Sequence, residues 1–359
     1  MNPRPSVQPW NARTAAIRGQ IVLSALIPIS ISVLVLLLTG LDFSVVLLAC
    51  FLPLQLGAAG FLGWKHYGRR GIKDAVLFVA TFFFSSLVFV LLTSVLVSVA
   101  VAGFKTIAPH FFYQNNVYVD NNTPLEYGGV GHAILGTLLV VLMTTIAAVP
   151  LGIAMAVYLT QSQAKHLGLV RTVVQALSGL PSVVAGLFIL AFMSFMKVQL
   201  GLPIEKSALT GALALFPLML PTVARVAEES LKLVPSDLRF AALALGAPNY
   251  RAFFQVILPA AKSGIVTAVL LGLARVAGET APLILTLNAN NSTNLNPFSG
   301  GIASLPTYIY GYLASGYSTS QARAWGGALV LLIVVGVLFG TARALSRPKL
   351  GKPTKKKAK

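Results

Sequence analysis

The feature that most constrains this chain is a series of apolar blocks, each close to the length of a membrane-spanning helix. Unbroken blocks of about 20 apolar residues indicate helices, because barrel strands would alternate apolar and polar residues. The composition agrees, since 56% of the 359 residues are hydrophobic and only 10% are charged. We therefore predict an all-α, polytopic transmembrane protein. The expected spans, about eight, are 21–41, 43–64, 75–103, 133–160, 175–196, 207–226, 263–287 and 324–343.

The distribution of positive charge predicts the orientation of these spans. The chain carries a net charge of +18, and 22 of its 27 Lys and Arg residues fall on one side of the predicted spans, with four on the other and Arg275 inside a span. Basic residues accumulate in cytoplasmic loops, so this bias places both termini in the cytoplasm. The basic residues lie in short loops and a tail, without the interleaved aromatics typical of nucleic-acid binding. We expect no nucleic-acid partner.

The spans and charges suggest four regions along the chain. Residues 1–20 form a cytoplasmic tail, and 21–72 form two anchoring spans with a basic loop. Residues 73–345 form the main transmembrane domain. Residues 346–359 form a lysine-rich tail that we expect to be attracted to anionic lipid headgroups. The single cysteine, Cys50, lies inside an apolar block, so neither a disulfide framework nor a cysteine metal site is expected.

The predicted loop of residues 235–262 carries the most specific pattern in the sequence. Ala241-Ala242 is followed after three residues by Gly246, and after nine more by the run 256–259, Val-x-Leu-Pro. Small residues around Ala242, with Leu245, suit a short helix that presses close to a partner. Gly246 would end this helix with a positive φ, and Pro259 would start the next span.

This loop resembles the EAA loop of type I ATP-binding-cassette importer permeases, in which Glu-Ala-Ala, Gly and Ile-x-Leu-Pro recur at the same intervals. The resemblance implies a core of six spans, to which the first two spans here are an addition, and a coupling helix that docks on an ATPase. Two positions depart from the pattern: Phe240 stands in place of Glu, and Val256 in place of Ile. The residues that the resemblance assigns to coupling are Phe240, Ala241, Ala242, Leu245, Gly246, Leu258 and Pro259.

Four further segments narrow the resemblance to the PstA family of phosphate importer permeases. They are the strings GLARVAGETAPLIL from Gly272, GLPSVVAGLF from Gly179, PLGIAMAVYL from Pro150 and SLPTYIY from Ser304. The resemblance covers roughly residues 128–343. It implies a bacterial-type inner membrane location and four partners: a second permease similar to PstC, an ATPase dimer similar to PstB, an external phosphate-binding protein similar to PstS, and phosphate.

A charged pair inside a span indicates an anion path independently of the family. Placing a charge at the bilayer centre costs about 2.5 to 3.5 kcal/mol, so Arg275 and Glu279 are not expected to face lipid. At i, i+4 spacing they share a helix face and can pair, and Pro282 disrupts the helix beside Gly278–Thr280. The guanidinium suits an oxyanion, which makes Arg275, Glu279, Thr280 and Pro282 candidate translocation residues. A structural ion pair that fixes helix packing is the alternative.

Other polar residues near the spans allow weaker hypotheses. Arg225 could meet the anion on exit, or it could be an interfacial arginine that reaches to the headgroups. The outer segment 105–132, rich in aromatics and Asn, could cap the outer mouth or contact a soluble partner, or be an ordinary loop. Some prolines are candidates for residues that bend helices lining a path. They are Pro150, Pro181, Pro217, Pro221 and Pro282.

The sequence favours no enzymatic activity. It contains no GxxxxGK[ST] phosphate loop, no HExxH and no serine elbow, and its four histidines lie in different loops. We expect no catalytic residues, cofactor or metal, and a separate ATPase must supply the energy. The sequence predicts a phosphate importer permease. A permease for sulfate, molybdate or phosphonate, an ion-driven secondary carrier and a membrane scaffold that moves nothing are the alternatives.

Overall fold

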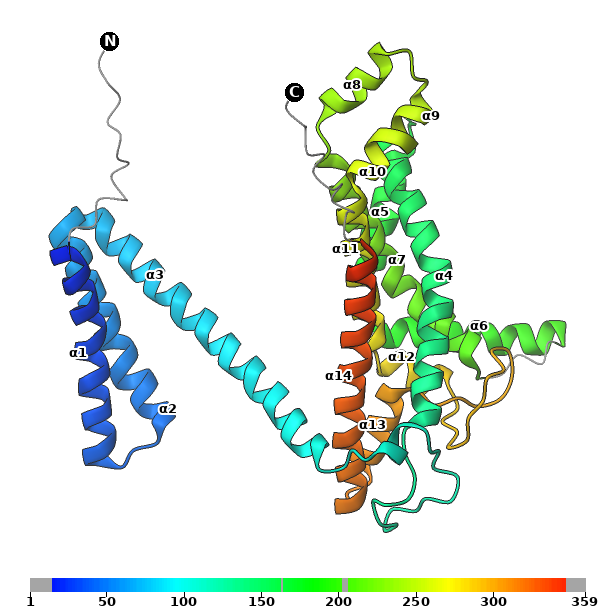
Figure 1. Ribbon diagram of the computed structural model, residues 1–359, viewed down its shortest axis with the longest axis horizontal. Helices are drawn as coiled ribbons and strands as arrows, with labels where there is room; N and C mark the ends of the chain where they lie inside the picture. Colours follow the sequence, from blue (N-terminus) through cyan, green and yellow to red (C-terminus); the bar gives the residue numbers. More distant parts are fainter. Residues whose placement is uncertain (1–14, 163, 202–205, 347–359) are drawn as a thin grey trace, which may run out of the picture. The chain divides into compact units, whose positions relative to one another are not determined.

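The structure, a computed structural model, describes residues 15–162, 164–201 and 206–346. In these residues every regular element is a helix (Figure 1). The chain divides into two compact units, Met1–Val97 and Ser98–Lys359, which are described separately. Most of the two predicted tails, 1–20 and 346–359, lies outside the described residues. The predicted boundary between residues 72 and 73 stays a prediction.

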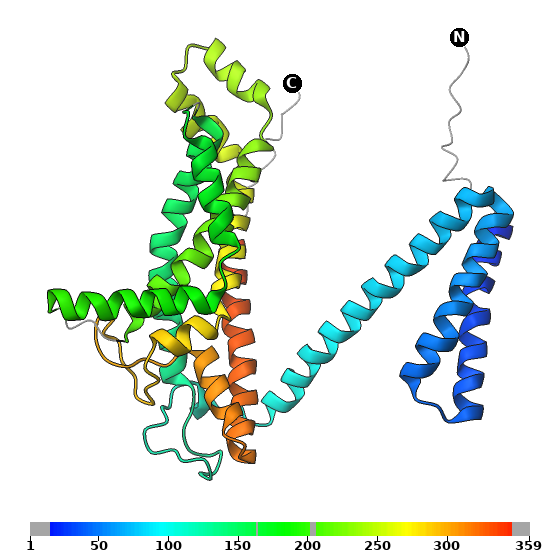
Figure 2. The same ribbon diagram turned by 180° about the vertical axis from the view of Figure 1, so that it is seen from behind.

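The first unit is a helical hairpin followed by a reversal of the chain. Helix α1 (Ala15–Thr39) is followed by α2 (Phe43–Val46), a π-helical turn (Leu47–Phe51) and α3 (Leu52–Phe104), which Gly68 interrupts with φ 65° and ψ −150°. Only glycine adopts such a backbone readily. Here α3 reverses its direction, as both views show (Figures 1 and 2). The interruption separates the predicted spans 43–64 and 75–103.

The second unit is built around two long helices, α4 and α7. They share a core in which Val140, Ala148, Leu215, Met219 and Val223 are almost wholly buried. The helices of this unit are α4 (Gly131–Gln161), α5 (Leu167–Ser178), α6 (Ser182–Leu200), α7 (Ala208–Lys232), α8 (Ser236–Ala244), α9 (Asn249–Arg251), α10 (Leu258–Ala260), α11 (Lys262–Ala277), α12 (Ala281–Thr286), α13 (Leu305–Ala314) and α14 (Ser318–Ser346). A π-helical stretch, Ala252–Ile257, joins α9 to α10.

Glycines allow two helices to approach α7 closely at one position. A Cβ atom on Gly152 of α4 would lie 2.9 Å from a methyl carbon of Val223, and one on Gly272 of α11 would lie 2.7 Å from the other. Ordinary side chains at these positions would force the helices apart. Both α4 and α11 are therefore packed against the middle of α7.

Six helices in the described residues are long and apolar enough to cross a membrane, or seven if a bent pair counts as one span. One of the six, Phe43–Phe104, contains both the second and the third predicted span. The multi-span, all-α fold is therefore confirmed.

Three predicted spans differ in their bounds from the helices of the structure. The fifth span does not begin at residue 175, because a break at Gly179–Pro181 separates α5 from α6 and the long apolar helix is Ser182–Leu200. A residue that precedes proline is disfavoured in helical conformation, which explains the break. The sixth helix continues past residue 226 to Lys232. The seventh span, 263–287, is two helices, α11 and α12.

The five candidate helix breakers fall into two groups. Pro150, Pro217 and Pro221 lie inside continuous helices, whereas Pro181 precedes α6 and Pro282 lies in the first turn of α12. A proline in the first turn costs no hydrogen bond, because that N–H has no partner within the helix. Only the last two mark interruptions of a helix.

Candidate translocation site and coupling loop

The predicted translocation residues lie at the break between α11 and α12. Helix α11 ends at Ala277, and the N–H of Glu279 donates a 3.3 Å hydrogen bond to the carbonyl of Val276. Helix α12 begins at Ala281 with Pro282 in its first turn. The ring of Pro282 removes the donor that would have reached Gly278, so the helix cannot continue through this segment. The predicted irregular turn at Gly278–Thr280 is present.

Arg275 and Glu279 do not form the ion pair that their spacing predicted. Arg275 is exposed in the last turn of α11 and Glu279 is half-buried beyond its end. Among the described residues, both ion pairs that the structure contains involve Glu228 instead. The expectation of pairing was wrong because it assumed a helix that continues to residue 279, and the helix ends before it.

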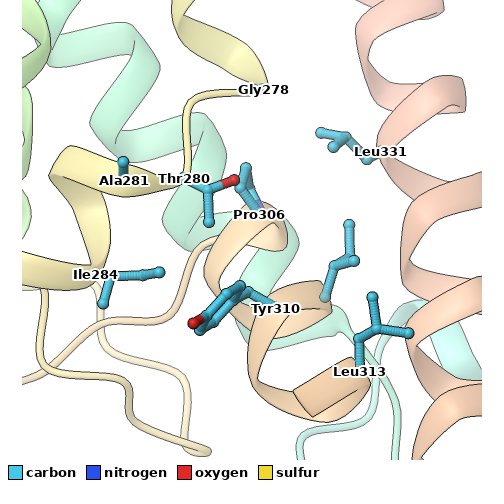
Figure 3. A pocket seen from close by; sticks show the side chains of 9 residues that line it. Gly278, Thr280, Ala281, Ile284, Pro306, Tyr310, Leu313 and Leu331 are labelled. Carbon is cyan, nitrogen blue, oxygen red and sulfur yellow. The ribbon is translucent and has the colours of Figure 1, made fainter. Parts of the chain in front are cut away.

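Pro282 and Thr280 occupy different surroundings although they are two residues apart. Pro282 is buried, and a Cβ atom on Gly186 of α6 would lie 2.8 Å from its Cα atom. Thr280 is half-buried and faces a groove between α12, α13 and α14 (Figure 3). Pro282 therefore packs α12 onto α6, while Thr280 is accessible.

The groove beside Thr280 has a volume of about 540 Å³ and mostly apolar walls. Hydroxyl groups of Thr280 and Tyr310 are its polar side-chain atoms (Figure 3). The residues that line it are Gly278, Thr280, Ala281, Ile284, Pro306, Ile309, Tyr310, Leu313 and Leu331. Neither Arg275 nor Glu279 is among them, so this groove by itself offers an oxyanion no charged partner.

Arg225 lies on α7, exposed, seven residues before the helix ends at Lys232. The two residues before it in the sequence, Val223 and Ala224, are fully buried in the core. The side chain thus projects away from the core of the second unit.

The first half of the predicted coupling loop is the exposed helix α8. It has no buried residue: Phe240 is 63% exposed, and Leu245, directly after the last residue of the helix, is 89% exposed. Ala241 is exposed and Ala242 half-buried. Gly246 follows with φ 82°, as predicted for the residue that ends the helix. The result is an apolar helix that the described chain leaves uncovered.

The second half of the loop is buried instead. Residues 249–260 form one helical stretch, in which Phe253 and Ile257 pack with Ala156 of α4 and with Ala227 and Leu231 of α7. Leu258 packs against the same cluster, whereas Pro259 is exposed. This stretch meets α11 at Ala261 with a bend of 67°.

Pro259 does not start the next span, contrary to the prediction. It lies within α10, before the bend, and α11 begins at Lys262. The prediction failed because the chain is already helical from Asn249, so Pro259 lies near the end of that helical stretch and not at the start of α11.

A buried carboxylate that is not among the predicted site residues lies close to the coupling loop. Glu228 is 8% exposed, and its Oε1 accepts hydrogen bonds from Arg171 of α5, at 3.0 Å, and from Lys232, one turn later on α7. The i, i+4 spacing of Glu228 and Lys232 was visible in the sequence. Arg171, 57 residues away, had no such signal. This network fixes α5 to the end of α7 from which α8 follows.

Comparison with known proteins assigns the family. A family model described as "Binding-protein-dependent transport system inner membrane component" matches residues 148–350, more than half of the chain. The chain belongs to this family. Membership implies an ATPase and a binding protein as partners of the permease, and places it in the inner membrane as a multi-pass protein.

Relatives of the permease carry phosphate transport in their names. "Phosphate transport system permease protein PstA 1" of Mycobacterium tuberculosis (strain CDC 1551 / Oshkosh) is 40% identical over 274 residues, which are 75% of this chain and 87% of that protein. PstA of Mycobacterium leprae (strain TN) is 41% identical over 280 residues, 76% and 89% of the two chains. A solved structure of the MetNI methionine ABC transporter, inward facing, is 22% identical, with a TM-score of 0.46 over 61% of this chain and 93% of that one.

Segment 105–132 of the permease is held in place by two buried polar residues. Arg323 of α14 is 1% exposed, and its Nη2 donates to the carbonyls of Thr123, Pro124 and Tyr127. Asn116 is fully buried, and its Nδ2 donates to the hydroxyls of Tyr308 and Tyr312 on α13. The segment 105–132 is therefore a fixed cap on α13 and α14. The exposed aromatic side chains of the segment, among them Tyr118 with an exposed fraction of 96%, are therefore held in place by these contacts.

Among the described residues, no group of three or more His, Cys, Asp or Glu side chains is arranged to hold a metal ion.

Proposed function

We propose that this chain is the permease subunit of an ATP-driven importer for inorganic phosphate. The observation that carries the proposal is the 40% identity to a phosphate transport permease over 87% of that protein's length. The chain is not an enzyme in this scheme, because ATP is hydrolysed by a separate ABC ATPase dimer. A second permease of the same family completes the path, and an external phosphate-binding protein delivers the cargo. Both termini lie in the cytoplasm.

In the proposed mechanism the ATPase acts on α8, which exposes Phe240 and Leu245. Helix 249–260 is packed into the cluster of Phe253 and Ile257, so a displacement of α8 is passed to it rather than absorbed. The 67° bend at Ala261 converts this displacement into a movement of α11. Arg275 occupies the last turn of α11, directly before the break at Gly278–Thr280. A push on α8 therefore repositions the residues at the break.

Arg275 supplies transient charge compensation to the anion in this scheme. Its guanidinium remains protonated and offers a planar fork of donors to an oxyanion. The side chain is exposed and has no ion-pair partner among the described residues, so it is available to a passing anion. Glu279 lies half-buried at the break, close in sequence, but within the part of the chain that the structure describes it forms no ion pair with Arg275.

Substitution of Arg275 tests the translocation role. We expect Arg275→Gln to lower phosphate uptake by about tenfold or more, and Arg275→Lys to restore only part of it, because an ammonium lacks the planar fork. Lys105→Gln, which removes an exposed charge from the outer segment, is the matched control. Each variant is first shown to co-purify with the ATPase. Normal uptake by an assembled Arg275→Gln complex would end the translocation role and leave a purely structural one.

Cargo and energy source are tested by uptake into vesicles that contain the whole complex and its external binding protein. Labelled phosphate should accumulate only with ATP and an active ATPase, and unlabelled phosphate should compete better than sulfate, molybdate or phosphonate. Stronger competition by another oxyanion would change the cargo assignment. Accumulation driven by an ion gradient without the ATPase would point to a secondary carrier.

A further inference from the structure

Four exposed cations lie around the reversal of α3 without partners. Lys65, Arg69, Arg70 and Lys73 are all exposed, and their side chains form no ion pair or hydrogen bond within the described residues. The acidic neighbour Asp74 forms no ion pair with them either. Arg171 and Lys232 in the second unit differ, because both form an ion pair with Glu228. The cations of the reversal must obtain their counter-charge from outside the described chain.

The turn that carries them is closed by a contact between glycines. A Cβ atom on Gly71 would lie 2.2 Å from the carbonyl oxygen of Gly63, so the backbones touch where the two halves of α3 cross. Residues 64–70 form the loop beyond this contact, and Gly68 gives it a backbone that other residues rarely adopt. Lys65, Arg69 and Arg70 lie in this short segment, and Lys73 follows it three residues later in the sequence.

A third helix end holds the same turn. His66 Nε2 lies 2.7 Å from Oε1 of Gln20 on α1, a hydrogen bond between residues 46 positions apart. Both views show the beginning of α1 beside the reversal of α3 (Figures 1 and 2). The turn is thus held at its base by glycines and at its side by α1. The positions of the cations are fixed more firmly than in an open surface loop.

Two aromatic residues indicate the depth of the turn in the membrane. Trp64 is 57% exposed and Tyr67 is 70% exposed, and both lie in the same turn as the cations. Trp and Tyr are enriched at the level of lipid headgroups, where their rings meet both apolar and polar surroundings. Apolar helices descend from the turn on both sides, so the cations lie at the headgroup level.

We infer that this turn is a binding site for the headgroup of an anionic phospholipid. The phosphate of the headgroup provides the counter-charge that the described chain lacks, and arginine and lysine are suitable donors to it. The acyl chains lie along the exposed apolar faces of α1 and α3, such as Phe61 and Phe78. The inference requires that the chain spans a membrane, but it is independent of the cargo. It gives the N-terminal hairpin a function in lipid binding.

Titration of the purified full chain with lipid tests the site. Native mass spectrometry in detergent counts bound phosphatidylglycerol and phosphatidylcholine for three proteins: the unchanged chain, a variant with all four turn cations changed to Gln, and Gly71→Ala. The glycine variant keeps every charge, and its added methyl group forces the two halves of α3 apart. A matched control changes four tail lysines, Lys355, Lys356, Lys357 and Lys359, to Gln.

The unchanged chain should retain a saturable phosphatidylglycerol adduct and bind phosphatidylcholine at least about tenfold more weakly. Both the turn variant and Gly71→Ala should lose that adduct, and the tail variant should keep it. Two results would overturn the inference. In one, the tail variant loses as much lipid as the turn variant, which means diffuse attraction. In the other, Gly71→Ala binds like the unchanged chain, which means that charge alone suffices without a formed site.

Discussion

The two halves of the coupling loop have opposite surroundings although they are adjacent in the sequence. Helix α8 exposes apolar side chains, with Phe240 at 63%, while Phe253 in the following helical stretch is 7% exposed. An exposed apolar helix on a short loop is typical of a surface that a partner covers. A buried helix, by contrast, is held in position by the side chains that pack around it. The comparison shows an exposed, largely apolar helix joined directly to a helical stretch that is packed into the core.

The glycine between the two halves separates their roles. Gly246, at φ 82°, ends α8, so the exposed helix is not a continuation of the buried one. The buried stretch packs on α4 and α7 and bends into α11. Substitutions in the buried half should therefore reduce stability, and substitutions in the exposed half should reduce docking while stability stays the same.

The largest expected effect on stability comes from Phe253→Ala. Truncation of a buried phenylalanine leaves a cavity and typically lowers the free energy of unfolding by about 3 to 5 kcal/mol. Thermal unfolding of the purified protein in detergent measures the change. Phe254→Ala, at a neighbour that is 62% exposed, is the control and should change stability by less than about 0.5 kcal/mol. Equal losses from both variants would mean that the second half is not anchored as described.

A smaller effect is expected from Glu228→Gln. The substitution removes the negative charge that pairs with Arg171 and Lys232, and we expect it to lower the free energy of unfolding by about 1 kcal/mol, less at high salt. The exposed neighbour Glu229, changed to Gln, is the matched control. Thermal unfolding at low and high salt makes the comparison. A Glu228 variant that behaves like the Glu229 variant would show that this network does not fix α5 to α7.

The smallest effect on stability, and a large effect on assembly, is expected from Leu245→Ser at the C-terminal end of α8. A side chain that is already exposed contributes little to folding, so stability should change by less than about 0.5 kcal/mol. Co-purification of the ATPase should nevertheless fall, because an apolar contact is lost. Leu295→Ser, 65% exposed in the outer loop before α13, should leave the ATPase bound. A Leu245 variant that unfolds early yet still binds the ATPase would reverse the proposed roles of the two halves.

The sequence predicted the fold well because lipid restricts the possible structures to so few. Apolar blocks identified the helices, and the motif around Ala241 and Gly246 identified the loop and the glycine that ends α8. The break after Ala277 was also predictable, since a proline four residues beyond Gly278 removes a helical hydrogen bond. These features depend on local chemistry, which a sequence displays directly.

Features that depend on contacts between distant residues were not predictable. The pairing of Glu228 with Arg171 and the contacts of Arg323 with the outer segment each join positions far apart in the sequence. The prediction that Arg275 and Glu279 form an ion pair failed for a related reason. An i, i+4 spacing produces a pair only if the helix continues through both residues. The break between α5 and α6 is a different case, because Pro181 signals it locally and the predicted span starting at residue 175 did not use that signal.

Cross-linking from Leu245 tests most directly whether a separate ATPase acts on the exposed half of the coupling loop. A Leu245→Cys variant in a Cys50→Ser background carries one cysteine, on α8, and Leu295→Cys in the same background is its counterpart in the outer loop. In membranes with an active complex, we predict a cross-link from residue 245 to the ATPase and none from residue 295. A complex that imports its cargo while residue 245 never cross-links to an ATPase would contradict the account.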